Sequence, residues 1–206
     1  MPPSSDIHIT VALELYHEAP TDSPWAYTIH ATAQPINTTT SPPPAAPIGS
    51  ATAYIIDRFF MGEAGINFED MDELSATTGE IIYDAIFFDD VTMEPFSVFH
   101  EVVVGTAWRR RGVGRDLVKA IHDKVHAHFG HGSYAFGAPG HLGAEVEREA
   151  QQQGLSWFRA ADEDQMFEIQ GRQLDAARAF WGKMGYKKMG ESKFWEVLVG
   201  GGVGDF

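Results

Sequence analysis

Cysteine is absent from this chain of 206 residues. A disulfide framework, a thiolate metal site and a cysteine nucleophile are therefore excluded. The sequence also lacks any apolar run near the ~20 residues that a membrane-spanning helix needs. Its first six residues have neither the basic nor the apolar region of a signal peptide. We expect a cytoplasmic protein with no membrane partner.

Basic residues are almost missing from the first half of the chain. Residues 1–108 contain sixteen Asp or Glu but only Arg58 as a base, whereas residues 109–206 contain fourteen Lys or Arg and thirteen Asp or Glu. The net charge of −14 is thus concentrated before residue 109. Such an acidic half repels phosphate backbones and attracts cations, so we expect no nucleic-acid partner.

Apolar side chains at alternate positions predict strands at 7–15, 25–33 and about 48–57, and a further strand at 96–104 is expected to be buried. A proline-rich stretch at 35–47 predicts a flexible loop. Spacings of three and four residues predict helices at about 67–87, 112–129, 142–153 and 173–184. Short strands are expected near 134–136 and 193–199, followed by a mobile tail at 200–206. These elements predict one α/β domain over 1–206.

A short turn between a buried strand and a helix is the most informative segment. It comprises Val102 to Val104, the bases Arg109, Arg110, Arg111 and Arg115, and the sequence Gly112-Val113-Gly114. A helix start has backbone N–H groups with no internal partner and a positive dipole, which suit a diphosphate. Glycine removes the Cβ atoms that would block its approach. The segment therefore predicts an anion site.

This segment resembles the acetyl-CoA signature of the GNAT superfamily of N-acetyltransferases, in which Arg or Gln precedes a Gly-x-Gly or Gly-x-Ala by three positions. Arg109 to Gly114 match that pattern. A second stretch, from Ala177 to Tyr186, resembles the family's Ala-x-x-Phe-Tyr-x-x-x-Gly-Phe. The resemblance covers about 96–199 well and the first 95 residues by topology alone. It implies a GNAT fold, a mixed and mostly antiparallel sheet of about six or seven strands with about four helices.

The resemblance implies acetyl-CoA as the cofactor. The strand before the turn would bulge and splay from its neighbour, so that the backbone of Val102, Val103 and Val104 binds the pantetheine arm. Phe180 and Trp181 would pack along that arm. The full set of expected cofactor-binding residues is Val102, Val103, Val104, Arg109, Arg110, Arg111, Gly112, Val113, Gly114, Arg115, Phe180, Trp181 and Lys183.

A general base is expected on the strand before the turn. With a period of two, His100 shares a face with Val98, Val102 and Val104, and Glu101 shares the other face with Phe99 and Val103. His100 is the first choice because an imidazole takes up protons near neutrality. Glu101 is the second choice, should the bulge reverse the faces. A hydrogen-bonded core histidine is the alternative interpretation of His100.

Trp181 departs from the family, because many members have a tyrosine there that protonates coenzyme A. An indole cannot supply that proton, so the general acid is left unassigned. His122 and His126 lie one helical turn apart, as in some zinc helices. Asp123 stands where those helices have Glu, and we expect solvated histidines and no metal.

The resemblance predicts an acetyl-CoA-dependent N-acetyltransferase acting on a primary amine. The acidic half favours a small cationic amine, with Glu69, Asp70, Asp72 and Glu73 as candidate acceptor residues. The alternatives are an acetyltransferase for protein N-termini or lysines, a catalytically inactive acyl-CoA-binding module and, more remotely, a nucleotide-binding module. Homodimerisation is left open.

Overall fold

The computed structural model describes residues 7–16, 24–36, 47–65, 95–130, 133–140, 143–156, 158–190 and 193–199. The predicted helix at 67–87, the tail at 200–206 and most of the predicted loop at 35–47 lie outside these residues. So do the four acidic candidates for the acceptor site, Glu69, Asp70, Asp72 and Glu73.

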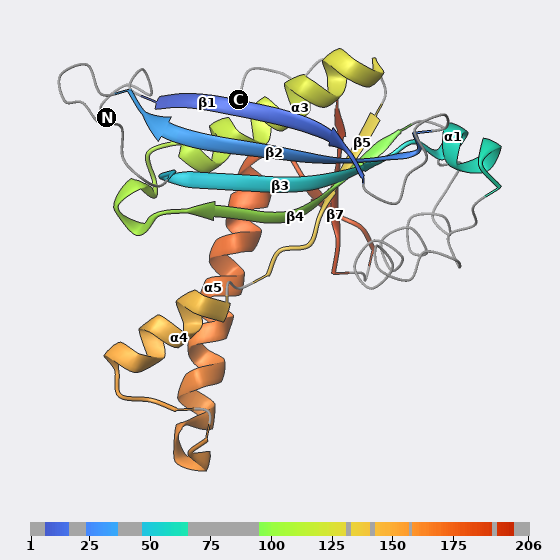
Figure 1. Ribbon diagram of the computed structural model, residues 1–206. Helices are drawn as coiled ribbons and strands as arrows, with labels where there is room; N and C mark the ends of the chain where they lie inside the picture. Colours follow the sequence, from blue (N-terminus) through green and yellow to red (C-terminus); the bar gives the residue numbers. More distant parts are fainter. Residues whose placement is uncertain are drawn as a thin grey trace. The chain divides into compact units, whose positions relative to one another are not determined.

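The described residues form one mixed sheet of seven strands with the order β1-β2-β3-β4-β5-β7-β6 (Figure 1). β1, β2, β3 and β4 pair antiparallel in succession, as do β6 and β7. The predicted α/β fold with a mixed, mostly antiparallel sheet is confirmed. The strands are β1 (Ile7–Leu15), β2 (Ala26–Pro35), β3 (Gly49–Ile56), β4 (Phe96–Val104), β5 (Ser133–Gly137), β6 (Lys187–Lys188) and β7 (Trp195–Val199).

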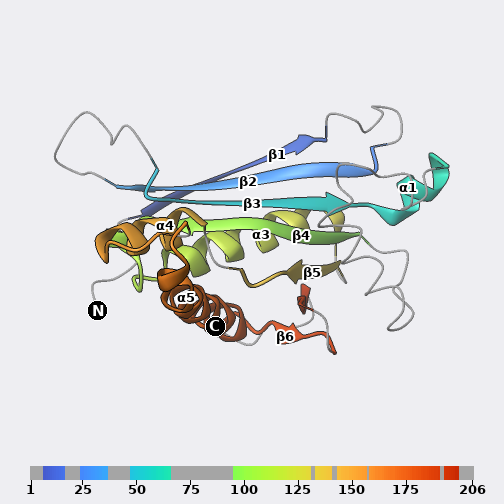
Figure 2. The ribbon, with the colours of Figure 1, turned by 90° about the horizontal axis from the view of Figure 1, so that it is seen from below.

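Helix α3 (Val113–Phe129) packs on one face of β1 to β4 (Figures 1 and 2). Its buried stripe includes Leu117, Ile121 and Val125, which meets the alanine-rich inner face of β2 and β3. The small side chains Ala31, Ala51 and Ala53 on that face are almost fully buried. Gly130 ends the helix with φ +89°. The predicted second helix and its glycine cap are confirmed.

The opposite face of β2 and β3, called the open face here, carries the even-numbered side chains. The register aligns Thr32 with Ser50 and His30 with Thr52 across these two strands. Nδ1 of His30 lies 3.1 Å from Oγ1 of Thr52. Alternation therefore gives the middle of β2 and β3 an apolar face under α3 and a polar face opposite it, while Ala26 and Ile56 at one end of the open face are buried.

The chain divides into two compact units, Met1–Phe136 with Val197–Phe206, and Gly137–Glu196. The second unit contains α4 (Gly143–Gln152) and α5 (Glu163–Lys183). Met166 and Ile169 of α5 pack with Val146 and Ala150 of α4. Arg172 of α5 pairs with Glu149 of α4 at 2.7 Å. The expectation of a single domain stays a prediction.

The structure differs from the sequence expectation in a short helix, in one helix boundary and in the burial of one strand. α1 (Arg58–Glu63) was not predicted; Asp57 caps it by accepting hydrogen bonds from the amides of Phe59 and Phe60. α5 begins at Glu163 rather than near 173, and the acidic Glu163 and Asp164 of its first turn suit the positive end of the helix dipole. The apolar run Val102 to Val104 is only part-buried, whereas Phe96 to Phe99 are buried.

Within the described residues, no helix is both long and apolar enough to cross a membrane.

Candidate functional site

Gly112 begins α3 in a left-handed conformation, with φ +88° and no side-chain cap. Its carbonyl accepts the first helical hydrogen bond, from the amide of Asp116 at 2.9 Å. Within the described part of the chain, no hydrogen-bond acceptor is found for the amides of Val113, Gly114 and Arg115. Three amide donors therefore converge at the positive end of the helix dipole, in the arrangement that binds phosphate groups.

The turn before Gly112 is held against the end of the sheet. A 3₁₀ helix, η4 (Thr106–Trp108), follows β4, and Gly105 donates its amide to the carbonyl of Ile48 at 2.9 Å. Gly49 lets the first turn of α3 approach, since a Cβ there would lie 3.2 Å from Val113 and 3.0 Å from the carbonyl oxygen of Val103. The helix start is thus fixed beside the end of β4.

The four arginines of the turn have different surroundings. Arg109 donates from Nε to the carbonyl oxygen of Val104 at 3.1 Å, which ties the turn to the strand. The guanidinium of Arg111 lies 5.1 Å from the centre of the Trp108 ring, a cation–π contact. Arg115 pairs with Asp116 at 3.0 Å, so its charge is partly offset. Arg110 makes no ion pair with any other described residue.

Arg110 also has φ +59°, which is the left-handed region. A residue with a Cβ adopts this conformation at a cost of about 1–2 kcal/mol. The turn therefore maintains a strained backbone at an exposed arginine. Such strain gathers at ligand sites, where the surrounding structure fixes a geometry that binding needs.

The strand leading to the turn contains a β-bulge. β3 aligns Ala53 with Phe99 and Thr52 with Glu101, which leaves His100 as an extra residue without a partner in the register. The irregularity that the resemblance implied for this strand is confirmed, and it lies at His100. A bulge bends a strand and changes the aim of the side chains at that point.

The bulge changes which side chains share a face. Residues directly opposite each other lie on one face of a sheet, so Glu101 follows Thr52 on the open face and Val102 follows Ala51 on the α3 face. The ring of His100 contacts Tyr54, with centroids 5.8 Å apart, and Tyr54 is also on the open face. The expected strict alternation is therefore wrong here. His100 and Glu101 are both exposed on the same face.

The second unit contains three of the predicted cofactor residues, Phe180, Trp181 and Lys183. Trp181 is only 6% exposed and packs on Gly137, where an added Cβ would lie 3.1 Å from the indole. Its ring contacts Tyr186, with centroids 4.6 Å apart. Phe180 is part-buried and Lys183 is exposed in the last turn of α5. The role of all three in cofactor binding stays a prediction.

His122 differs from the expected solvated histidine. It is part-buried on α3, and its ring lies 5.7 Å from that of Phe99 on β4. This burial lowers the pKa of His122 to about 4, because it penalises the charged imidazolium. His126 instead has Nδ1 3.1 Å from the carbonyl oxygen of Gly130. A search of the described residues finds no cluster of three or more side chains suited to a metal ion.

Tyr54 is the residue of this site that the sequence did not single out. It faces the bulge from β3, and its ring contacts both His100 and Tyr16. Tyr54 belongs to a strand in which buried and part-buried residues alternate regularly, so the sequence around it does not indicate a functional role. Only the register of β3 against β4 places it beside His100.

Comparisons with known proteins find similarity in solved structures and none in sequence. No family model matches it, and no curated protein matches it in sequence. Among solved structures, it is similar to the crystal structure of Arabidopsis thaliana NAA60 in complex with acetyl-CoA, with 14% sequence identity and a TM-score of 0.33. The match covers 61% of this chain and 62% of that one, which is less than two thirds of that protein's chain.

Proposed function

We propose that this protein is an acetyl-CoA-dependent N-acetyltransferase whose acceptor is a small cationic amine. The observation that supports this most strongly is the arginine-flanked glycine turn at the start of α3, with the amides of Val113, Gly114 and Arg115 open to a ligand. A diphosphate fits this donor set, and Arg110 and Arg111 add positive charge beside it.

The strand that precedes the turn supports an acyl carrier rather than a simple nucleotide. His100 lies at the bulge of β4 and Val104 ends the strand four positions further on. At about 3.3 Å per residue this is roughly 13 Å of strand. A ligand whose diphosphate is held at the turn and whose arm extends back along β4 would bring its end to His100 and Glu101.

Acetyl-CoA supplies an acetyl thioester, and acetyl transfer requires an acceptor nitrogen that has lost a proton. We assign His100, which is exposed beside the bulge, as the base that takes that proton. Glu101 lies on the same face and is the alternative base. The thiolate that leaves must gain a proton from solvent or from a group that is not assigned, because the indole of Trp181 cannot donate one.

The open face of the sheet favours a cationic acceptor. β1, β2, β3 and β4 contain no Lys or Arg, whereas Glu14 and Glu101 lie on the face where His100 is exposed. A positively charged amine would meet carboxylates there without nearby like charge. Acetylation of a protein N-terminus or lysine is the alternative, since both present the same ammonium group.

A transfer assay that follows thiol release from acetyl-CoA tests this function. We expect amine-dependent release with polyamines or short alkylamines in the wild-type protein. His100→Gln should lower kcat by about 100-fold or more, the range of general-base catalysis, with little effect on acetyl-CoA binding. Peptides with free N-termini or lysines form the second panel. Binding of acetyl-CoA without turnover of any amine or peptide would instead identify an inactive acyl-CoA-binding module.

A further inference from the structure

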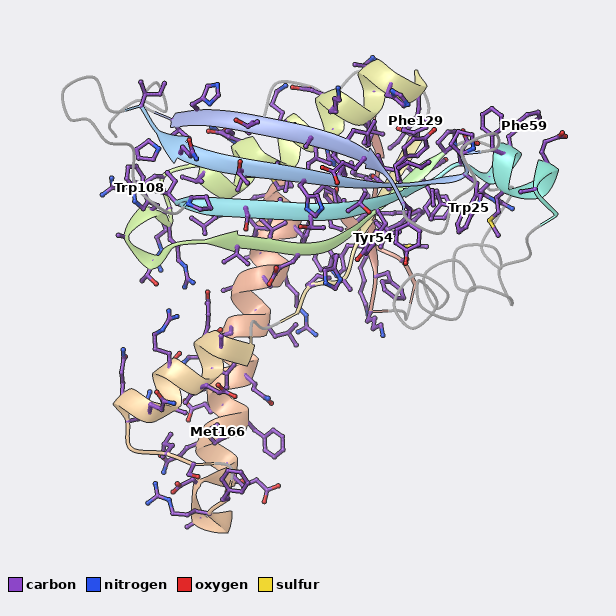
Figure 3. All side chains as sticks on the ribbon, in the orientation of Figure 1. Trp25, Tyr54, Phe59, Trp108, Phe129 and Met166 are labelled. Atoms are coloured by element: carbon purple, nitrogen blue, oxygen red, sulfur yellow. The ribbon has the colours of Figure 1, made fainter. Side chains whose placement is uncertain are left out.

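An aromatic and acidic cluster lies on the open face, beside the bulge in β4. The ring of Tyr54 lies 5.8 Å from the ring of His100, at an interplanar angle of 56°. On its other side, Tyr54 meets Tyr16 edge to face, with centroids 6.1 Å apart. Tyr16 is only 8% exposed, so it supports the position of Tyr54. Figure 3 labels Tyr54 on β3, further along the sheet than Trp108 at the turn.

The register places Glu101 and Tyr54 on the same face of neighbouring strands. Glu101 is directly opposite Thr52, and Tyr54 is two residues further along β3 on the same face. Such diagonal neighbours are about 7–8 Å apart at the backbone, a distance that aromatic and long side chains span. The bulge adds His100 between them.

Among the residues that the structure describes, none neutralises the charge of Glu101. Within the described part of the chain, Glu101 makes no ion pair and no side-chain hydrogen bond, and Thr52 is engaged by His30. The four strands contain no Lys or Arg that would compete for the carboxylate. A part-buried tyrosine ring and a carboxylate that no described side chain neutralises together attract an organic ammonium ion.

We propose that Tyr54 and Glu101 form the binding site for the ammonium group of the acceptor amine. The ring binds the cation through its face, the carboxylate binds it as an ion, and His100 lies where the proton must leave. This inference rests on the proposed acetyl transfer for its biological purpose. The site itself is a property of the sheet and does not require the cofactor.

Butylammonium chloride is the probe that tests this site, with 1-butanol as its uncharged analogue. The full-length protein is titrated with each, and the ring signals of His100 are followed by NMR, assigned by their loss in His100→Gln. We expect butylammonium to shift these signals in a saturable way and 1-butanol to leave them unchanged. An equal response to both probes, or no response to either, would overturn the proposal.

Variants separate a role in binding from a role in folding. Tyr54→Ala and Glu101→Gln should each weaken butylammonium binding by about two- to fivefold, and together by about tenfold. Tyr54→Phe retains the ring, so its affinity for butylammonium should stay within about twofold of wild type. If Tyr54→Phe and Tyr54→Ala weaken binding equally, the cation is not held by the ring and the assignment of Tyr54 is wrong.

Calorimetry with acetyl-CoA on the same variants distinguishes this inference from the proposed function. We expect Tyr54→Ala and Glu101→Gln to bind acetyl-CoA as the wild type does. If the protein binds acetyl-CoA and both variants keep the wild-type affinity for butylammonium, the ammonium site is rejected and the proposed acetyl transfer is not. Butylammonium binding that depends on both residues, in a protein that ignores acetyl-CoA, would reject acetyl transfer and leave the site standing.

Discussion

Gly112 and Gly114 have different physical roles, although both belong to one Gly-x-Gly motif. Gly112 has φ +88°, so it supplies a left-handed turn that residues with a Cβ adopt only under strain. Gly114 lies inside α3, without a positive φ, where glycine weakens a helix. Gly114 lowers helix stability and is not needed for the backbone conformation. We therefore explain it by the space that the missing side chain leaves beside the open amides.

Gly114→Ala should therefore move stability and binding in opposite directions. Alanine should raise the free energy of unfolding by about 0.5–1 kcal/mol, because it restricts the unfolded chain. The added methyl group beside the open amides should weaken acetyl-CoA binding by about tenfold, or ~1.4 kcal/mol. Thermal unfolding and calorimetry check the two effects.

Gly171 offers a matched control for this substitution. It is exposed within α5, and an added Cβ there would meet no atom within 4 Å. Gly171→Ala should stabilise the protein by a similar ~0.5–1 kcal/mol and leave acetyl-CoA affinity unchanged. If the Gly114→Ala protein is more stable and still binds acetyl-CoA normally, then Gly114 is not needed to make room for the ligand.

Arg110 combines a strained backbone with a positive charge that pairs with no acidic group in the described ranges. Arg110→Gly should release strain and stabilise the protein by about 1 kcal/mol. It should also weaken acetyl-CoA binding by roughly threefold to tenfold, because a charge beside the diphosphate is lost. Calorimetry at low and high salt measures the change, and the difference between variant and wild type should shrink as salt rises.

Lys124→Ala is the corresponding control, since it removes one positive charge from the exposed side of α3, more than two turns beyond its first residue. We expect its acetyl-CoA affinity to equal that of the wild type. If Lys124→Ala and Arg110→Gly weaken binding to the same degree, only the net charge of the protein matters and the turn has no specific role.

At the scale of elements, α3 begins at the turn and packs on the sheet through its buried stripe and through the ring of His122, which contacts Phe99. Burial lowers the pKa of His122 to about 4, below the ordinary value of 6.5 that applies in the unfolded chain. The unfolded state therefore binds more protons than the folded state between pH 6.5 and 4. The free energy of unfolding is therefore not reduced by His122 above pH 6.5, and it decreases as the pH falls from 6.5 to 4.

His122→Phe tests this linkage, because phenylalanine keeps a ring against Phe99 without titrating. We expect the wild type to lose about 2 kcal/mol of unfolding free energy between pH 6.5 and 4 that His122→Phe retains. Denaturant unfolding at several pH values measures the difference. His8→Gln, on the exposed side of β1, should follow the wild-type pH profile. Parallel profiles for wild type and His122→Phe would contradict the burial effect.

Sequence patterns predicted the elements whose signal is local and periodic. β1 was predicted over 7–15 and spans Ile7–Leu15, because its apolar residues alternate without interruption. α3 was predicted within one residue, owing to its regular stripe and its glycine cap. α1 was missed because a helix of six residues is too short to show periodicity.

The site was predicted only in the part that is continuous in sequence. The motif from Arg109 to Gly114 is local, and in the structure it follows β4 and a 3₁₀ helix and leads into the first residues of α3. The joint exposure of His100 and Glu101 depends on a bulge against β3, which leaves no mark in the alternation of β4 itself. Tyr54 enters the site through the same register, so the sequence of β4 could not indicate it.

At the scale of the whole molecule, the acidic residues and the arginines are concentrated in different parts of the sequence. The half that contains β1 to β4 up to Trp108 has a formal charge near −15, from sixteen acidic residues and one basic residue. The arginines begin at the turn. An anionic carrier and a cationic acceptor would thus be attracted to different parts of one sheet, the turn and the open face.

Calorimetric titration of the wild-type protein with acetyl-CoA tests the central claim most directly. The account predicts saturable binding of one molecule per chain in the micromolar range. Free coenzyme A should compete with it, and Gly114→Ala should weaken it while Gly171→Ala does not. No binding of acetyl-CoA at millimolar concentration, or equal binding by both glycine variants, would contradict the account.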